Sequence, residues 1–239
     1  MAKIKELDQK TLDEMKKRET GRDTKRLKKI QYFEGLRNTP PQCPHGYNIP
    51  TRYSMSSLDG FKGPKSLIDK CRAFWHGSML LTGKPGCGKT HLGAAVMMNT
   101  HTKDWQYFCD QQISKINDGE DPAKDFNSRK LFITVPELLM EIRSSFNDDT
   151  DYTEMDMVEK YSSVPFLVLD DLGSEKTTEY AVTTLYLIID NRYSWMKDTI
   201  ITTNLTASEI GEKLNERIAS RLNSYQLVRI DLPDYRKGK

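Results

Sequence analysis

The segment at residues 83–90, GKPGCGKT, constrains the fold of this chain more than any other feature. It satisfies the pattern G-x-x-x-x-G-K-[ST], and it stands between a short apolar run at 79–82 and a helix-like segment at 90–99. Its glycines let the backbone curl so that successive N–H groups point at one anion. The N-terminus of the following helix adds partial positive charge. The segment therefore predicts a strand–loop–helix unit that binds a phosphate chain.

Two side chains of this loop have predicted roles toward a nucleotide. Lys89 places its ammonium on the β- and γ-phosphates, and the hydroxyl of Thr90 binds Mg²⁺. The predicted nucleotide-binding loop comprises Gly83, Lys84, Pro85, Gly86, Cys87, Gly88, Lys89, Thr90 and His91. Kinases, motors, switches and assembly factors all use such a loop, so it does not determine the function by itself.

Apolar strand-like runs alternate with helix-like segments along residues 50–239. The predicted strands are 79–82, 130–135, 166–169, 199–203 and 226–231, and the predicted helices are 90–99, 136–146, 177–194 and 207–222. The TVPE sequence at 134–137 predicts a capped helix start with an early proline. Residues 102–129 are polar and acidic, and they predict an excursion from the sheet. The alternation predicts an α/β fold with a parallel sheet covered on both faces.

Acidic and amide side chains follow two of the predicted strands. Asp170 ends the apolar run in PFLVLDDLGSE, where it would hold Mg²⁺ through the water shell of the ion. Asp171 would orient or deprotonate the attacking water, and Glu175 is a second candidate for that base. Asn204 ends TIITTN and would reach the γ-phosphate or this water. The alternative is a pair of surface aspartates and a turn-forming asparagine.

Three arginines complete the candidate site. Arg217 and Arg221 share one face of the helix in NERIASRL. They form either surface ion pairs with Glu216 or Glu212, or an arginine finger that reaches a neighbouring subunit's γ-phosphate. Arg236, in LPDYRKGK, is expected to touch the nucleotide of its own subunit.

The N-terminal part of the chain differs in composition from the rest. Residues 1–37 are charged and predict marginal helices, and the proline-rich stretch at 38–50 predicts a linker. Net charge is +2, yet residues 16–29 hold eight lysines and arginines against two acidic residues. This basic run either contacts nucleic acid or an acidic protein surface, or is a solvated tail. We expect a basic helical segment at 1–49 and a nucleotide-binding domain at 50–239.

Composition narrows the class of protein. Mean hydropathy is −0.66, and no run approaches the roughly 18 apolar residues that span a bilayer. We therefore expect no membrane association, and the N-terminus lacks the apolar core of a secretory signal. Four cysteines without a CxxC pair favour a reducing cytoplasm over a disulfide framework.

The ordered set GKPGCGKTHL, FLVLDDLGSE, TIITTN, ERIASRL and DYR resembles the AAA+ ATPases of the DnaC/DnaI helicase-loader family, with the transposition ATPase IstB a close relation. The resemblance covers about residues 50–239. It implies Lys89 and Thr90 as Walker A, Asp170 and Asp171 as Walker B, and Asn204 as sensor 1. It also implies Arg221 as arginine finger, with Arg217 the weaker alternative, Arg236 as sensor 2, and Tyr53 and Phe61 along the adenine pocket.

Several features depart from the family pattern. Cys87 stands where a small hydroxyl residue or glycine is usual, and Asp171 is one methylene shorter than the usual glutamate, which predicts slow hydrolysis. The segment after Arg236 leaves no room for the usual C-terminal helical lid. Only Cys43 and His45 stand where some relatives hold zinc, so we do not expect zinc.

The resemblance implies an ATP- and Mg²⁺-dependent factor that loads a ring-shaped replicative helicase onto single-stranded DNA. The N-terminal segment would bind the helicase, and subunits would self-associate through Arg221. An IstB-type transposition ATPase is the alternative, and a small-molecule kinase is a third reading that Asn204 and Arg221 argue against. The family also implies a DNA-facing element at 137–161, with Arg143, Ser144 and Phe146, although Phe146 equally suits the core.

Overall fold

The computed structural model of the chain describes residues 9–40, 47–123, 125–126, 128–145 and 152–237, with side chains from residue 23 onward. Contacts group the chain into two compact units. One unit holds residues 1–42 and 102–127, and the other holds residues 43–101 and 128–239. The predicted division of the chain at residues 49 and 50 stays a prediction.

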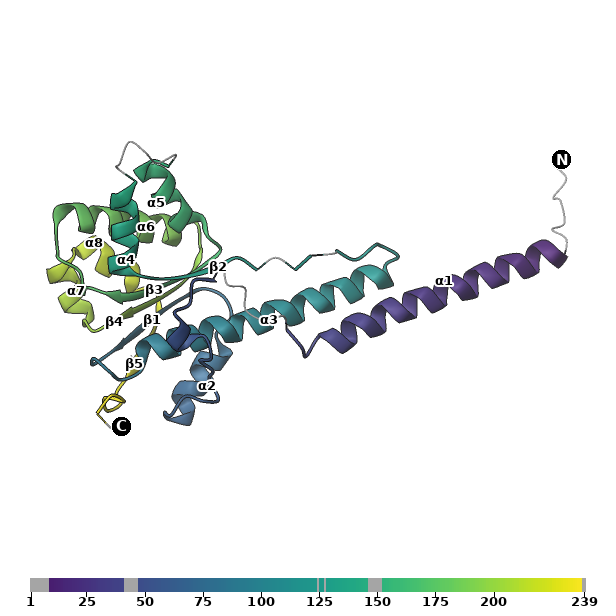
Figure 1. The fold of residues 1–239 in the computed structure, drawn as a ribbon, viewed down its shortest axis with the longest axis horizontal. Coiled ribbons are helices and arrows are strands. Elements are labelled where there is room, and N and C mark those ends of the chain that lie inside the picture. Colours follow the sequence, from purple (N-terminus) through teal and green to yellow (C-terminus); the bar gives the residue numbers. More distant parts are fainter. Residues whose placement is uncertain (1–8, 41–46, 124, 127, 146–151, 238–239) are drawn as a thin grey trace. The chain divides into compact units, whose positions relative to one another are not determined.

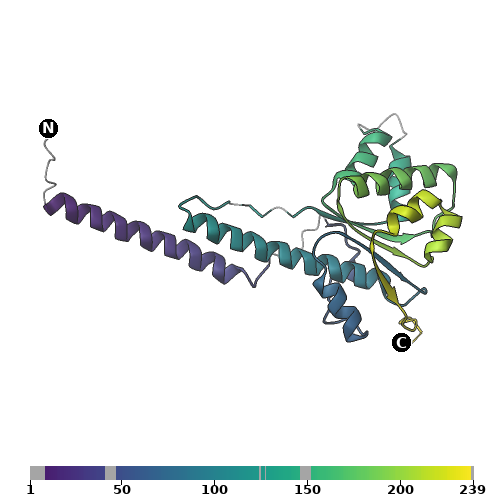
Figure 2. The same ribbon diagram turned by 180° about the vertical axis from the view of Figure 1, so that it is seen from behind.

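A five-stranded parallel sheet forms the centre of the second unit, as the views from opposite sides show (Figures 1 and 2). The strands are β1 Ser78–Gly83, β2 Lys130–Thr134, β3 Phe166–Leu172, β4 Asp198–Thr203 and β5 Gln226–Ile230. They lie in the order β2-β3-β4-β1-β5, and every adjacent pair is parallel. The predicted parallel α/β fold is confirmed.

Each face of the sheet is covered by helices (Figure 1). Alternate strand residues such as Leu80, Leu167 and Ile201 pack against α4 Val135–Ser144, α5 Glu154–Ser163, α6 Glu179–Ser194, α7 Ala207–Lys213 and α8 Glu216–Leu222. Their neighbours Leu81 and Val168 face the opposite way, onto α2 Lys65–Ala73 and the first turns of α3 Lys89–Asn117. Because successive strand side chains point to opposite faces, apolar runs of this kind require cover on both sides. A short 3₁₀ turn, Thr51–Tyr53, precedes α2.

The helix boundaries agree with the sequence where capping signals are strong. Thr134 caps α4 through a reciprocal pair of bonds with Glu137, as the TVPE sequence predicts. The single helix expected at 207–222 is wrong, because the chain breaks between α7 and α8. Asn215, with φ −170°, accepts a hydrogen bond from the backbone of Ile218 at 2.7 Å and so starts a new helix. Helices α2 and α5 were not predicted.

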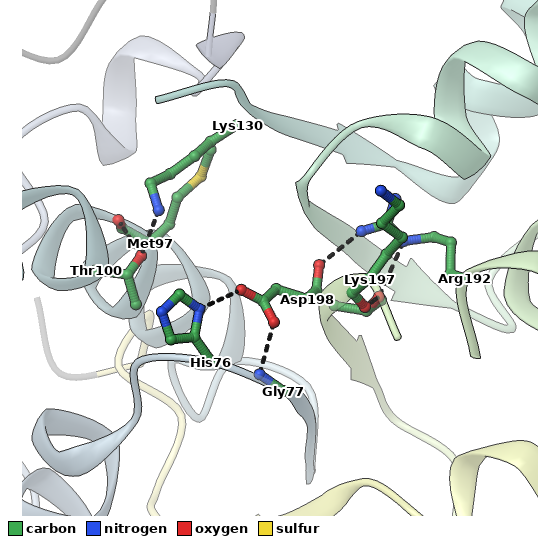
Figure 3. A network of polar contacts seen from close by, with 9 residues as sticks. His76, Gly77, Met97, Thr100, Lys130, Arg192, Lys197 and Asp198 are labelled. Carbon is green, nitrogen blue, oxygen red and sulfur yellow. Dashed lines mark hydrogen bonds and ion pairs between the residues drawn. The ribbon is translucent and has the colours of Figure 1, made fainter. Parts of the chain in front are cut away.

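A buried arginine of α6 ties α5 and β4 together at the amino-terminal side of the sheet. Figure 3 shows this residue, Arg192, bonded to Asp198 at the start of β4. Arg192 is fully buried, and its guanidinium donates to the Thr199 hydroxyl and to four backbone carbonyls, those of Tyr161, Ser162, Val164 and Asp198. Burial lowers the pKa of Arg192 to about 10. The side chain thus satisfies carbonyls that α5 leaves without partners at its C-terminus.

The first unit is a helix pair made by α1 Gln9–Leu36 and the second half of α3. The excursion from the sheet predicted at 102–129 agrees with the structure, which places residues 102–127 in this unit. The helix expected at 90–99 is too short, because α3 continues to Asn117. Trp105, Cys109 and Ile116 recur at helical spacing and form a small core with Phe33 of α1. Trp105 also donates to the Leu36 carbonyl at 2.8 Å.

Part of the basic run is engaged within this unit. Arg26 bonds Asn117, and Lys29 pairs with Asp121 at 3.0 Å, while Lys25 and Lys28 are exposed.

Across the described ranges, no helix combines the length and apolar character needed to cross a membrane. Between β5 and residue 237, the described chain forms no separate lid domain.

Candidate nucleotide-binding site

The loop between β1 and α3 contains two positions with positive φ angles that favour glycine, Gly86 and Gly88. Gly86 has φ +80°, and a Cβ there would stand 1.9 Å from Oδ1 of Asp234. Gly88 has φ +97°, and a Cβ would stand 2.9 Å from the Phe61 ring. Residues with a Cβ are strained in this region of backbone space, so the loop requires glycine at these two positions.

The side chain of Lys89 lies folded against its own loop. Its ammonium donates to the carbonyls of Gly83 at 2.9 Å and Lys84 at 3.0 Å, and to Oδ1 of Asn204 at 2.5 Å. A lysine has three N–H donors, so all three are engaged. Burial lowers the pKa of Lys89, and the carboxylates of Asp171 and Asp170 oppose that shift. The ammonium of Lys89, the predicted phosphate-binding group, therefore lies against the loop predicted to bind the phosphates.

The two oxygens of Asp170 have separate partners. Oδ2 accepts a hydrogen bond from the Thr90 hydroxyl at 3.0 Å, and Oδ1 accepts one from the Thr202 hydroxyl at 2.6 Å. Asp170 is 5% exposed, and this burial raises its pKa, while the bonds from Thr202 and Thr90 lower it. The structure thus brings the two predicted metal-binding residues, Thr90 and Asp170, into direct contact.

Asp171 and Asn204 meet at the same edge of the sheet. Nδ2 of Asn204 donates to Oδ1 of Asp171 at 3.2 Å, while its Oδ1 accepts from Lys89. Asp171 has φ +63°, which is uncommon for a residue with a side chain. Lys89, Asn204 and Asp171 therefore form one continuous chain of polar contacts.

A cavity of about 1050 Å³ opens at this edge of the sheet. Of the residues predicted from the sequence, Tyr53, Phe61, Pro85, Gly86, Gly88, Lys89, Thr90, His91, Asp170, Asp171, Asn204 and Arg236 line it. Gly83, Lys84 and Cys87 are not part of the lining, although Lys84 and Gly83 bind the ammonium of Lys89. A cavity of this size, lined by both polar and apolar side chains, suits a ligand as large as a nucleoside triphosphate.

The segment after β5 forms one wall of this cavity. The backbone N–H of Tyr235 donates to the Gly86 carbonyl at 3.1 Å, and its hydroxyl donates to the Lys62 carbonyl. The Phe61 ring lies between those of His91 and Tyr235, with centroids 5.8 and 6.2 Å away. Burial lowers the pKa of His91. These contacts bring Arg236 to the cavity.

The two candidate finger arginines lie away from the cavity of their own chain. Arg221 pairs with Asp190 of α6 at 2.7 Å, and its guanidinium lies 4.9 Å from the Tyr193 ring centroid. Arg217 lies over Tyr186, at 5.8 Å. The alternative in which Arg221 pairs with Glu216 or Glu212 is therefore wrong, because α8 packs against α6 and brings Asp190 within reach.

Other predicted residues have positions outside this cavity. Glu175, the second candidate base, accepts a hydrogen bond from the backbone of Gly173 at 2.9 Å and does not line the cavity. Arg143 and Ser144 are exposed on α4, where the Arg143 guanidinium lies 5.6 Å from the Tyr180 ring centroid. Phe146, Cys43 and His45 lie outside the described residues.

Sequence reasoning missed several residues of the site. Thr202 contacts both acidic residues, and its position two before Asn204 on a strand was a usable signal, since alternate residues share a face. Six lining residues were not predicted as part of the site: Pro50, Arg52, Gly60, Lys62, Thr134 and Tyr235. They come from segments far apart in the sequence. Tyr235 stands in the DYR segment and Thr134 in the TVPE segment, but neither pattern assigns them to the site.

The residues present fit a nucleotide with Mg²⁺. The loop presents backbone N–H groups at a helix N-terminus beside the Lys89 ammonium, which is the chemistry of a polyphosphate site. Thr90 and Asp170 offer hydroxyl and carboxylate oxygens within 3.0 Å of each other, and Mg²⁺ prefers oxygen ligands.

No family model matches the chain. It is 26% identical over 167 residues to the replicative helicase loader DnaC of Buchnera aphidicola subsp. Baizongia pistaciae (strain Bp), covering 67% of this chain and 58% of that protein. It is also 26% identical over 145 residues to DnaC of Escherichia coli (strain K12), covering 61% and 49%. The chain thus spans about half the length of the curated relatives it matches.

Solved structures share the fold. The DnaC helicase loader superposes with a TM-score of 0.58 at 22% identity, over 76% of this chain and 100% of that one. DnaI gives 0.55 at 20% identity, over 77% and 93%. The replication initiator DnaA, bound to AMPPCP and single-stranded DNA, gives 0.56 at 16% identity, over 77% and 51%. In its motif set and sequence the chain is thus similar to DnaC helicase loaders, and it shares the fold of DnaC, DnaI and DnaA.

Proposed function

We propose that the protein is an AAA+ ATPase of the cytoplasm that loads a ring-shaped replicative helicase onto single-stranded DNA. ATP binding and hydrolysis would switch assembly with the helicase and release from it. One observation carries the proposal: a DnaC-like chain brings Lys89, Thr90, Asp170, Asp171 and Asn204 to one edge of its sheet, beside a cavity of about 1050 Å³.

Different residues of the site would bind the phosphates, the rest of the nucleotide and Mg²⁺. The loop N–H groups and Lys89 bind the phosphates, and Tyr53, Phe61 and Arg236 lie along the same cavity. Thr90 and Asp170 would hold Mg²⁺, which when bound neutralises charge on the phosphate oxygens. To reach a phosphate, Lys89 exchanges at least one of its three present acceptors for a phosphate oxygen.

Asp171 and Asn204 are placed to act on the attacking water. The Asp171 carboxylate orients the water and accepts its proton, and Asn204 holds that carboxylate by its amide N–H. Because Asn204 also bonds Lys89, it connects the phosphate-binding and water-orienting sides of the site. The short Asp171 side chain is consistent with slow hydrolysis, which suits a switch for assembly.

The partners follow from charge and from the relatives. The exposed lysines of α1, Lys25 and Lys28, favour an acidic surface on the helicase. Relatives named DnaC are replicative helicase loaders, and the related DnaA was solved with single-stranded DNA. Arg221 lies away from its own cavity, which supports a role in completing the site of a neighbouring subunit.

A loading assay on circular single-stranded DNA tests this function, because a closed circle has no end over which a ring can thread. The full chain with ATP should place the host's ring helicase on the circle, and Lys89→Ala should not. Lys25→Glu and Lys28→Glu, singly and together, should weaken the helicase complex, whereas Lys65→Glu, an exposed lysine of α2, should not. Failure of the wild-type chain to bind or load the helicase, or capture of a transposase in its place, would overturn the proposal.

A further inference from the structure

Thr202 is the single residue of β4 that stands opposite both acidic residues. Leu169 of β3 pairs with Ile201 and Leu172 pairs with Thr203, so β3 contains one residue more than β4 between these points. The ladder therefore has a bulge in which Asp170 and Asp171 together face Thr202. Bulges of this kind re-aim side chains and are frequent beside active sites.

The hydroxyl of Thr202 bonds both acidic residues at once. It donates to Oδ1 of Asp170 at 2.6 Å and accepts the backbone N–H of Asp171 at 2.9 Å. The first bond fixes the carboxylate so that its other oxygen, Oδ2, faces the Thr90 hydroxyl. The second gives a partner to an N–H that the bulge displaces from the ladder, at a residue with φ +63°.

We propose that Thr202 is a positioning residue for nucleotide-bound Mg²⁺ and for hydrolysis, because its hydroxyl holds Asp170 and Asp171 in one fixed arrangement. The inference rests on the proposed ATPase function. The inference goes beyond that function because it assigns a role to a side chain outside the cavity. Thr202 is 1% exposed and is not part of the cavity lining. Groups that hold a metal-binding carboxylate orient it and tune its affinity for the metal.

The neighbouring Thr203 provides a matched control. It lies on the same strand, is fully buried, and makes the same number of hydroxyl bonds, donating to the Leu172 carbonyl at 2.7 Å and accepting from the Leu205 N–H at 3.0 Å. Its bonds involve neither acidic side chain. If a buried threonine hydroxyl in β4 served stability alone, loss of either hydroxyl would have the same consequences.

The test compares Thr202→Val, Thr202→Ser and Thr203→Val in the full chain. Fluorescence titration with a labelled ATP analogue measures affinity with and without Mg²⁺, steady-state hydrolysis gives kcat, and thermal unfolding reports stability. Thr202→Val should reduce both the Mg²⁺-dependent gain in affinity and kcat by about 10- to 100-fold, leaving Mg²⁺-free affinity unchanged. Thr202→Ser should restore both, and Thr203→Val should affect stability alone.

Two results separate failure of this inference from failure of the proposed function. If the wild-type chain neither binds the analogue nor hydrolyses ATP, the ATPase function itself is wrong. If the wild type is active and Thr202→Val behaves like Thr203→Val, Thr202 is structural only. Should Thr202→Val not fold, Thr202→Cys keeps the size with a weak donor, and it should fall between the serine variant and inactivity.

Discussion

Replacing Arg221 with alanine should abolish ATP hydrolysis while leaving nucleotide binding intact. The guanidinium is held by Asp190 at 2.7 Å and by the Tyr193 ring, and Arg221 does not line the cavity of its own chain. A direct effect on binding within one subunit is therefore not expected. Contact with a neighbouring subunit's γ-phosphate would give Arg221 its role in hydrolysis.

The size of the effect distinguishes a finger from a surface ion pair. Arginine fingers contribute about 10³- to 10⁵-fold to the hydrolysis rate. The pair with Asp190 joins partly exposed side chains, with 34% of the Arg221 side chain and 28% of the Asp190 side chain accessible, and such pairs contribute little to stability. Arg221→Ala should therefore unfold at nearly the wild-type temperature and still lose hydrolysis by about three orders of magnitude.

Mixing experiments give a numerical expectation for a finger acting between subunits. Lys89→Ala removes the phosphate-binding ammonium but keeps Arg221, and Arg221→Ala does the reverse. In an equimolar random mixture, about one interface in four combines an intact loop with an intact finger, since each interface is head-to-tail. The mixture should therefore recover about a quarter of the wild-type rate.

Two outcomes would refute this reasoning. Unchanged hydrolysis in Arg221→Ala alone would remove the finger assignment and leave Arg221 as the surface partner of Asp190. A loss that mixing does not rescue would place the effect within one subunit. Arg217→Ala, one helical turn away over Tyr186, is the control and should retain most of the activity.

Three further predictions follow from the geometry. Gly86→Ala should lower nucleotide affinity by about tenfold or more, measured by fluorescence titration, because a positive φ and a Cβ 1.9 Å from Asp234 strain the loop by about 1–3 kcal/mol. Arg192→Met leaves four backbone carbonyls without their donor and should cost about 3–5 kcal/mol, lowering the unfolding temperature by roughly 10 °C; a shift no larger than that of exposed Arg143→Met would contradict this. Trp105→Ala should free α1 from its small core, which limited proteolysis and circular dichroism would detect, with ATP hydrolysis unchanged; an α1 as protected as in the wild type would count against that core.

The elements that the sequence predicted well are those in which local signals agree. The apolar runs at β1, β3 and β4 are bounded by glycine or acidic residues, and Thr134 with Glu137 marks the start of α4. The loop at 83–90 was predicted because its glycines, Gly86 and Gly88, adopt the positive φ angles that the loop needs. Asp170, Asp171 and Asn204 were placed together correctly because carboxyl ends of parallel strands meet at one edge.

The errors arose where partners distant in sequence decide the structure. Nothing local requires α3 to continue to Asn117, since its second half is stabilised by Phe33 of α1. The break between α7 and α8 at Asn215 interrupts a pattern that reads as one helix. Asp190 as the partner of Arg221 depends on how α8 crosses α6.

The sequence by itself determined the chemistry of the site: a loop with the glycines a phosphate cradle requires, a lysine and a threonine at its end, and acids and an amide behind apolar strands. Only the tertiary structure decided which of these groups contact one another. It folded Lys89 onto Asn204, set Thr202 opposite both Asp170 and Asp171, and directed Arg221 away from its own cavity. The reason is physical: residue types and spacings are local properties, whereas strand register, bulges and helix crossings arise from packing between segments far apart in the chain.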